Sequence, residues 1–267
     1  MQLTFPYHET WLHRVNPGLK LILFVLLFFI VILIHNLNIL INLTAGVLLL
    51  LALGSGHPWK RLLLYSSPFV LVFISTATGM MMFGQGSTTW LKYGLLHVTE
   101  ESFFRGLHLG FRALNMAAAG LLLGLTTRPV YLFYSLMQQW RLPPKYAYSF
   151  LAAMRMLPLL LEEFQTLRNA LKVRGTRTSY GLKGLYLTIQ RYAIPLLAQS
   201  IRRAQRIAIA MEAKRFSNEV KRTYYYKIKY SCWDVIFVVY FAAVVILSYW
   251  IGTVWPYFAT VDVRGLL

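Results

Sequence analysis

Long runs of apolar residues, separated by short polar segments, dominate the first half of the chain. Residues 19–34 are apolar apart from Lys20 at the edge, and a second apolar run covers residues 39–53 after a polar break at 35–38. Each run is slightly shorter than the ~20 residues that a helix needs to cross a ~30 Å hydrocarbon core, so polar residues such as Asn42 must join the span. The pattern predicts a hairpin of two membrane helices.

Three further apolar runs have the length of a membrane span. They cover residues 62–83, with Pro68 near the start, residues 103–125 and residues 233–251. The run at 103–125 contains three alanines and a glycine at 117–120, small residues that allow close helix packing. Aromatic residues flank the last run, as they do at membrane interfaces. The sequence therefore predicts an all-α integral membrane protein with about five transmembrane helices.

The stretch between the fourth and fifth runs has helical periodicity but is too charged to remain in lipid. A first helix is expected from Pro144 to Arg174-Gly175, because apolar residues recur at helical spacing up to Leu171 and glycine then favours a stop. A second helix of the same design is expected from Pro195 to about residue 215. Each of these amphipathic helices ends in a basic tip. A positive charge near a helix C-terminus interacts favourably with the helix dipole and stabilises the helix by ~0.3–1 kcal/mol. This effect alone would explain one basic tip.

Charge divides the chain into three parts. The net charge is +18, from 27 Lys and Arg against 9 Asp and Glu, and only 13% of residues are charged while 57% are hydrophobic, which argues against a soluble globule. Residues 126–230 hold 19 of the 27 basic and 4 of the 9 acidic residues. We therefore expect four spans in 1–125, a basic helical domain in 126–230, and the last span with a tail in 231–267.

The same charges predict the orientation in a cell membrane. Arg14 and Lys20 precede the first span, Lys60 and Arg61 separate the second from the third, and the basic domain follows the fourth, so all fall on one side. Positive loops face the cytoplasm. A multi-pass protein with a cytoplasmic N-terminus, a cytoplasmic 126–230 domain and an outside C-terminus is expected, and no cleavable signal peptide is recognised.

Several classes of chemistry lack support in the sequence. The six histidines show no HExxH spacing, no P-loop occurs, and a single cysteine, Cys232, permits neither an internal disulfide nor a cysteine-based zinc site. No Asp or Glu occurs between residues 10 and 99, which argues against an ion-coupled carrier. The basic domain has no nucleic-acid-binding motif. We expect no catalytic residue, no metal site, no cofactor and no nucleic-acid partner.

Arg112 is an unusual residue for a membrane span. It shares a helix face with Arg105 and His108, at steps of three and four residues near the start of the fourth span. Arg105 is expected to reach the interface with its long side chain. Arg112 lies deeper and should face protein or water rather than lipid.

Five segments, in order along nearly the whole chain, resemble the transmembrane T component of energy-coupling factor (ECF) transporters, the EcfT family with its CbiQ branch. They are TWLHRVNPGLK at 10–20, Arg112 followed by Thr126-Thr127, LPPK to MRMLPLLLEE at 142–163, NALKVRG at 169–175 and RRAQRIAIAMEAKRF at 202–216. The resemblance implies cytoplasmic coupling helices and a non-catalytic subunit. It also implies three partners: two ABC ATPase subunits and a separate substrate-binding membrane S component for vitamin or transition-metal uptake.

The last two segments resemble the family's pair of Ala-Arg-Gly-like coupling motifs. The first is Val173-Arg174-Gly175, and the resemblance implies that Arg174 docks into an ATPase groove. The second, Ala213-Lys214-Arg215, has lysine where the family has arginine and arginine where it has glycine. Lysine keeps the charge but lacks the planar fork that grips a carboxylate with two hydrogen bonds. Either Lys214 acts as a weaker point charge or Arg215 takes over the contact.

A conventional permease that binds its own solute between the spans is the alternative function. Such a protein would need no substrate-binding partner. Copurification separates the two hypotheses, because a T component should bring down ATPase subunits and a second membrane protein.

Overall fold

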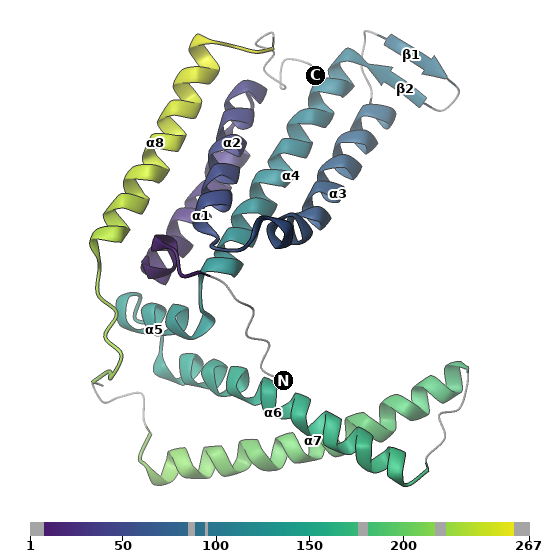
Figure 1. Cartoon of the computed structure of the whole chain (residues 1–267), viewed down its shortest axis with the longest axis vertical. Helices are drawn as coiled ribbons and strands as arrows, with labels where there is room; N and C mark the ends of the chain where they lie inside the picture. Colours follow the sequence, from purple (N-terminus) through teal and green to yellow (C-terminus); the bar gives the residue numbers. More distant parts are fainter. Residues whose placement is uncertain (1–7, 85–88, 94–95, 176–180, 217–222, 259–267) are drawn as a thin grey trace. The chain divides into compact units, whose positions relative to one another are not determined.

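The computed structural model describes residues 8–84, 89–93, 96–175, 181–216 and 223–258. In chain order its elements are η1 (Trp11–Arg14), α1 (Pro17–Leu33), α2 (Leu37–Gly54), α3 (Trp59–Phe83), β1 (Thr89–Tyr93), β2 (Leu96–Thr99), α4 (Glu100–Thr126), α5 (Pro129–Gln139), α6 (Pro144–Val173), α7 (Leu182–Ala213) and α8 (Cys232–Val254) (Figure 1). Contacts divide the chain into two compact units. Unit 1 comprises Met1–Ser135 and Ile228–Leu267, and unit 2 comprises Leu136–Lys227.

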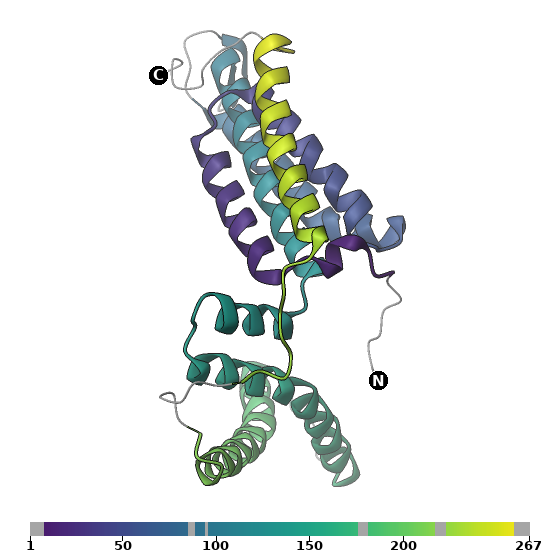
Figure 2. The same cartoon turned by 90° about the vertical axis from the view of Figure 1, so that its left-hand side faces the viewer.

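Unit 1 is a bundle of the five predicted membrane helices. Helices α2, α3, α4 and α8 are long and apolar enough to cross a membrane, and the apolar α1 is slightly shorter with 17 residues. Helix α4 packs against α1, α2 and α3, and α8 packs against α2 (Figure 2). The prediction of an all-α membrane protein is confirmed. Many large apolar side chains on α3 and α8 are exposed, as helices facing lipid require.

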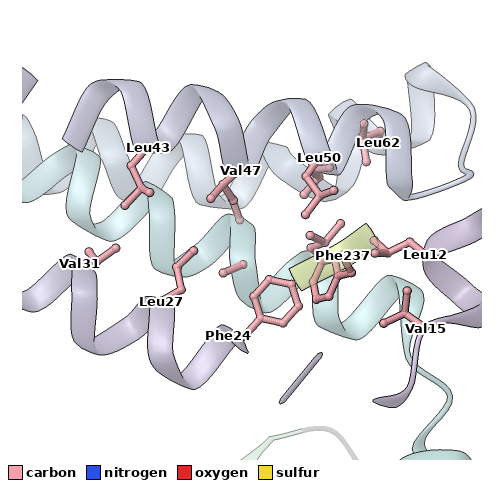
Figure 3. Close-up of a cluster of buried hydrophobic side chains, with 14 of the residues drawn as sticks. Leu12, Val15, Phe24, Leu27, Val31, Leu43, Val47, Leu50, Leu62 and Phe237 are labelled. Atoms are coloured by element: carbon pink, nitrogen blue, oxygen red, sulfur yellow. The ribbon is translucent and has the colours of Figure 1, made fainter. Parts of the chain in front are cut away.

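The bundle core is built from the inner faces of all five helices. Leu27 of α1, Leu43 and Val47 of α2, and Phe237 of α8 point toward one another there (Figure 3). Leu12 of η1 is also fully buried in this cluster. The short helix before the first span therefore closes the end of the bundle.

Polar side chains define where the spans begin. Asn16 caps α1 by accepting the N–H of Gly18 at 3.0 Å, and Asn36 caps α2 by accepting the N–H of Asn38 at 2.9 Å. The break between the two helices is shorter than the predicted 35–38, because α2 already begins at Leu37. Asn38 is buried, and its side chain donates to the carbonyl of Phe258 and accepts the N–H of that residue, both at 3.1 Å.

A short antiparallel hairpin joins α3 to α4. Strand β1 pairs with β2 so that Lys92 lies opposite His97 and Tyr93 opposite Leu96 (Figure 1). The long apolar runs do not predict these two strands. β-branched and aromatic residues do recur in them, and such residues favour strands.

Glycines let α3 and α4 approach each other closely, although at other positions than predicted. A Cβ atom on Gly106 would lie 2.7 Å from the carbonyl oxygen of Ala77, and one on Gly110 would lie 2.9 Å from the ring of Phe73. A Cβ on Gly120 would meet nothing within 4 Å, so the close contact expected at that glycine is absent, while Ala118 is buried. Composition therefore predicted close packing on the correct helix, but the close glycine contacts lie at Gly106 and Gly110 rather than at Gly120.

We expect Gly106→Ala to destabilise the protein, because the added methyl group collides with the α3 backbone and overpacking costs ~1–3 kcal/mol. Gly120→Ala is the matched control on the same helix. It should be neutral or stabilising by up to ~1 kcal/mol, since alanine favours a helix over glycine. Thermal unfolding of both variants in detergent checks this, and equal midpoints would contradict the close α3–α4 contact.

The histidine of η1 is held in its neutral form. The backbone N–H of Thr10 donates to Nδ1 of His13 at 3.2 Å, which requires that nitrogen to be unprotonated, and the Thr10 hydroxyl donates to the carbonyl of Gly54 at 2.6 Å. Burial, followed by the positive charge of Lys20, lowers the pKa of His13 below its usual 6.5, while Glu9 acts in the opposite direction. Protonation of Nδ1 would break the hydrogen bond from the Thr10 backbone, whereas the Thr10 hydroxyl, 2.8 Å from Nδ1, would still donate to Gly54.

Because the pKa of His13 is lower in the folded than in the unfolded protein, the unfolded state takes up a proton first as the pH falls. The stability contributed by neutral His13 is fully present above pH 6.5 and is lost below it. We expect the unfolding midpoint of the wild-type protein to fall between pH 7.5 and pH 5.5 by more than that of His13→Gln. Parallel pH profiles for the two proteins would contradict the neutral histidine.

Unit 2 contains two long helices that cross. Helix α6 begins with Pro144, as predicted, and ends at Val173. Helix α7 begins at Leu182, so the prediction that it starts at Pro195 is wrong: that proline lies inside the helix. A proline removes one backbone hydrogen bond, and neighbouring packing can outweigh that loss. The two helices contact through rings of Phe164 and Tyr192, with centroids 5.2 Å apart (Figure 2).

Candidate docking site at two helix ends

The first basic tip is a regular helix end. Arg174 follows the last residue of α6, and its N–H donates to the carbonyl of Ala170 at 3.1 Å. Gly175 then adopts a left-handed conformation with φ +66° and donates its N–H to the carbonyl of Lys172 at 3.1 Å. Glycine takes this conformation without steric cost, so the chain leaves the helix directly after Arg174.

The second tip has the same geometry with different side chains. Lys214 follows the last residue of α7, and its N–H donates to the carbonyl of Ala210 at 3.2 Å. Arg215 is left-handed with φ 52°, and its N–H donates to the carbonyl of Glu212 at 2.8 Å. Phe216 N–H donates to Met211 at 3.0 Å, which completes a Schellman motif.

The two ends can therefore be superposed residue by residue. Lys214 occupies the cap position that Arg174 occupies on α6, and Arg215 occupies the left-handed position of Gly175. A side chain in the left-handed region costs about 1 kcal/mol relative to glycine. The backbone at Arg215 thus retains the conformation for which glycine is the preferred residue.

The side chains at both tips face solvent. Val173 is 88% exposed, and Arg174, Lys214 and Arg215 are exposed as well. Within the described part of unit 2, none of these three basic side chains pairs with an Asp or Glu. Their charges are available to a partner.

Contacts between α6 and α7 orient the tips. Arg203 forms an ion pair with Glu163 at the crossing, where both side chains are largely buried. Phe216, directly after the second tip, packs edge-on against Tyr148 with ring centroids 5.7 Å apart. Beside the crossing lies a hollow of about 340 Å³ with a mostly apolar lining that includes Met156 and Ile207. The second tip is therefore placed by packing on α6.

Arg112 contacts the end of another span. Its Nη2 donates to the carbonyls of Ile32 and Ile34 at 3.0 and 3.2 Å, at the C-terminal end of α1. Nε2 of His108 lies 3.2 Å from the same Ile34 carbonyl. A cation at this end satisfies free carbonyls and offsets the helix dipole. The structure places Arg112 against protein, as its depth in the span suggested.

The sequence analysis missed a buried polar network at the opposite end of α1. Asn16, Ser135 and Asp234 are bonded to one another through the start of α1, and Lys20 Nζ donates to the carbonyl of Thr126 at 3.1 Å. Lys20 was expected at the edge of the first span, and the structure buries it. Two signals were present: an asparagine before Pro17, and the Ser231-x-x-Asp234 spacing of a capping box.

The described residues contain no group of three His, Cys, Asp or Glu side chains that could hold a metal ion. Cys232 is a free, exposed thiol. The two basic tips are thus the part of the molecule whose chemistry calls for a partner.

Comparison with known proteins identifies the family of the chain. Residues 8–225 match the CbiQ family, described as cobalt transport protein. The chain belongs to the CbiQ family. Both helix tips and the polar start of α1 lie within the matched residues.

Relatives of this CbiQ-family chain are energy-coupling factor transporter transmembrane proteins EcfT. The protein from Brevibacillus brevis is 28% identical over 251 residues, which cover 91% of this chain and 94% of the relative. That from Listeria innocua is 26% identical over the same shares. That from Macrococcus caseolyticus is 23% identical over 85% of this chain and 89% of the relative. The CbiQ-family chain is therefore a multi-pass membrane protein of the energy-coupling factor transporter type.

Proposed function

We propose that this protein is the T subunit of an ECF-type ABC importer, which transmits ATP-driven movement of two ATPase subunits to a substrate-binding S component for vitamin or transition-metal uptake. The observation that carries the proposal is the matched pair of exposed basic ends on two long crossing helices. The subunit itself has no catalytic residue, and its partners hydrolyse ATP.

Each tip supplies one cation to one ATPase subunit. Arg174 offers a planar guanidinium that can form two parallel hydrogen bonds to a carboxylate. Lys214, at the equivalent cap position, offers a point charge. Two contacts on two separate helices suit two ATPase subunits, because closure of the ATPase pair would then move α6 relative to α7.

Exposed apolar side chains on unit 2 support contact with a membrane partner. Leu157 and Leu161 of α6 and Ile194, Leu197 and Ile201 of α7 are exposed. Neither helix is apolar enough to be a span. Large exposed apolar surface of this kind marks an interaction site. The S component is the partner that this surface would contact.

The charge distribution supports a cytoplasmic location for unit 2, with the N-terminus inside and the C-terminus outside. The hollow that the described residues form among α1, α2 and α8 does not favour the alternative permease function. The hollow among α1, α2 and α8 is apolar and has a volume of about 20 Å³, far below the ~300 Å³ of a ligand pocket.

Arg174→Ala should leave the bundle folded but weaken its association with ATPase subunits, because removing one partner of a buried charge contact costs ~2–5 kcal/mol. Affinity purification of the membrane complex, with partners identified by mass spectrometry, measures this. Lys172→Ala, at an exposed lysine two residues earlier on the same helix, is the control and should assemble normally. Full assembly and ATPase activity of Arg174→Ala would leave Arg174 as a dipole-compensating residue only.

The second tip gives an ordered series of variants. Lys214→Ala should reduce assembly and transport substantially, Lys214→Arg should preserve or strengthen both by restoring the guanidinium fork, and Arg215→Ala should be mild. Arg215→Gly should stabilise the helix end by about 1 kcal/mol without loss of assembly. Complex yields at equal membrane levels decide the order. A severe Arg215→Ala beside a silent Lys214→Ala would move the contact by one residue, roughly 100° around the helix.

A further inference from the structure

The chain passes between the two units at two places only. It leaves unit 1 after Ser135, inside α5, and returns to it at Ile228, shortly before α8. We call the first connection the outgoing passage and the second the returning passage. A movement of unit 2 that is transmitted along the polypeptide reaches the bundle only through these two connections. Their attachment inside unit 1 therefore matters for transmission.

The outgoing passage is attached to the start of α1. The hydroxyl of Ser135 donates to Oδ1 of Asn16 at 2.9 Å and accepts the N–H of Gly18 at 3.2 Å. Ser135 is fully buried. The last residue of unit 1 before the passage is thus held by two hydrogen bonds.

The returning passage is attached to the same residue of α1. Oδ1 of Asp234 accepts the backbone N–H of Asn16 at 2.7 Å, and Oδ2 accepts the N–H of Ser231 at 2.7 Å. Asp234 and Asn16 are each 3% exposed. The carboxylate therefore joins the end of the returning segment, the first turn of α8 and the cap of α1.

Within unit 2 the two chain segments are also bonded to each other. Nε2 of Gln138, at the end of α5, donates to the carbonyl of Tyr226 on the returning segment at 2.6 Å. The outgoing segment is helical, whereas residues 223–230 form no helix or strand. A helix transmits displacement better than an irregular segment, and this bond lets both move together.

We propose that Asn16, Ser135 and Asp234, together the passage anchor, are positioning residues through which movement of unit 2 reaches α1 and α8. The proposal rests on the proposed function. Apolar packing in the rest of the bundle is non-directional, whereas these buried hydrogen bonds fix both passages to one point. Breaking one of these hydrogen bonds would leave a buried polar group unpaired, which costs ~1–3 kcal/mol. The three residues of the anchor therefore resist separation.

The native Cys232 provides a reporter that needs no knowledge of the transported substrate. It is the single cysteine, is exposed, and lies between Ser231 and Asp234. The experiment uses the full chain copurified with its ATPase subunits in nanodiscs. Maleimide modification of Cys232 is followed by mass spectrometry with ATP or ADP, and ATP hydrolysis is measured on the same samples.

In the wild-type complex, ATP should change the modification rate by about fivefold or more, the usual lower range of coupling between sites. Ser135→Ala and Asp234→Asn should largely abolish that change while hydrolysis per assembled complex continues. Ser135→Thr, which keeps the hydroxyl, should retain the response. Thr44→Ala is the matched control, because it removes an equally buried hydroxyl that accepts from Asn115 at 2.6 Å, away from both passages. It should lower stability and keep the response.

Three results would overturn the anchor and leave the T-subunit function standing. They are an absent ATP response in a hydrolysing wild-type complex, an unchanged response in both Ser135→Ala and Asp234→Asn, and an equal loss in Thr44→Ala. Failure of both anchor variants to assemble would also overturn it, since the network would then serve folding. Failure of the wild-type chain to copurify with ATPases would instead refute the proposed function.

Discussion

Free backbone groups at helix ends are the constraint on which this structure depends. In lipid each unpaired carbonyl or amide costs several kcal/mol, so a span must satisfy its terminal groups within the protein. Here side chains from distant helices do so: Arg112 of α4 binds the end of α1, and Lys20 of α1 binds the end of α4. These reciprocal contacts hold α1 and α4 together at both ends and explain why two cations are tolerated in the bundle.

The ends of α6 and α7 differ from the ends of α1 and α4, because no side chain from a distant helix is needed to pair their backbone groups. Their backbone groups are satisfied locally by the turn itself, so their basic side chains are not used internally. The difference separates cations that complete the fold from cations that face a partner. By this criterion Arg112 belongs with the fold, while Arg174 and Lys214, which pair with no Asp or Glu among the described residues, are the cations that we propose bind a partner.

Long apolar runs let the sequence predict the five spans to within a few residues, because their length reflects the thickness of the bilayer. Features that are set by tertiary contacts could not be predicted from the sequence in the same way. Residues 129–139 are uncharged and begin with Pro129, but the run is too short to be a span and was included in the basic domain without a helix of its own. The start of α7 was misplaced because Pro195 reads as a helix start. At the second motif, spacing left Lys214 and Arg215 open. Only the backbone, with its left-handed Arg215, shows which residue is equivalent to Arg174.

Helix α8, which is synthesised after the other four helices of the bundle, closes the bundle at both ends. Asp234, at the start of α8, accepts the N–H of Asn16, and Phe258, beyond its end, bonds the side chain of Asn38. Until the ribosome has released this segment, both asparagines near the beginning of the chain lack these partners inside the membrane. A nascent or truncated chain would therefore expose unpaired polar groups to lipid, a state that membrane proteases and insertion chaperones can distinguish from the finished protein.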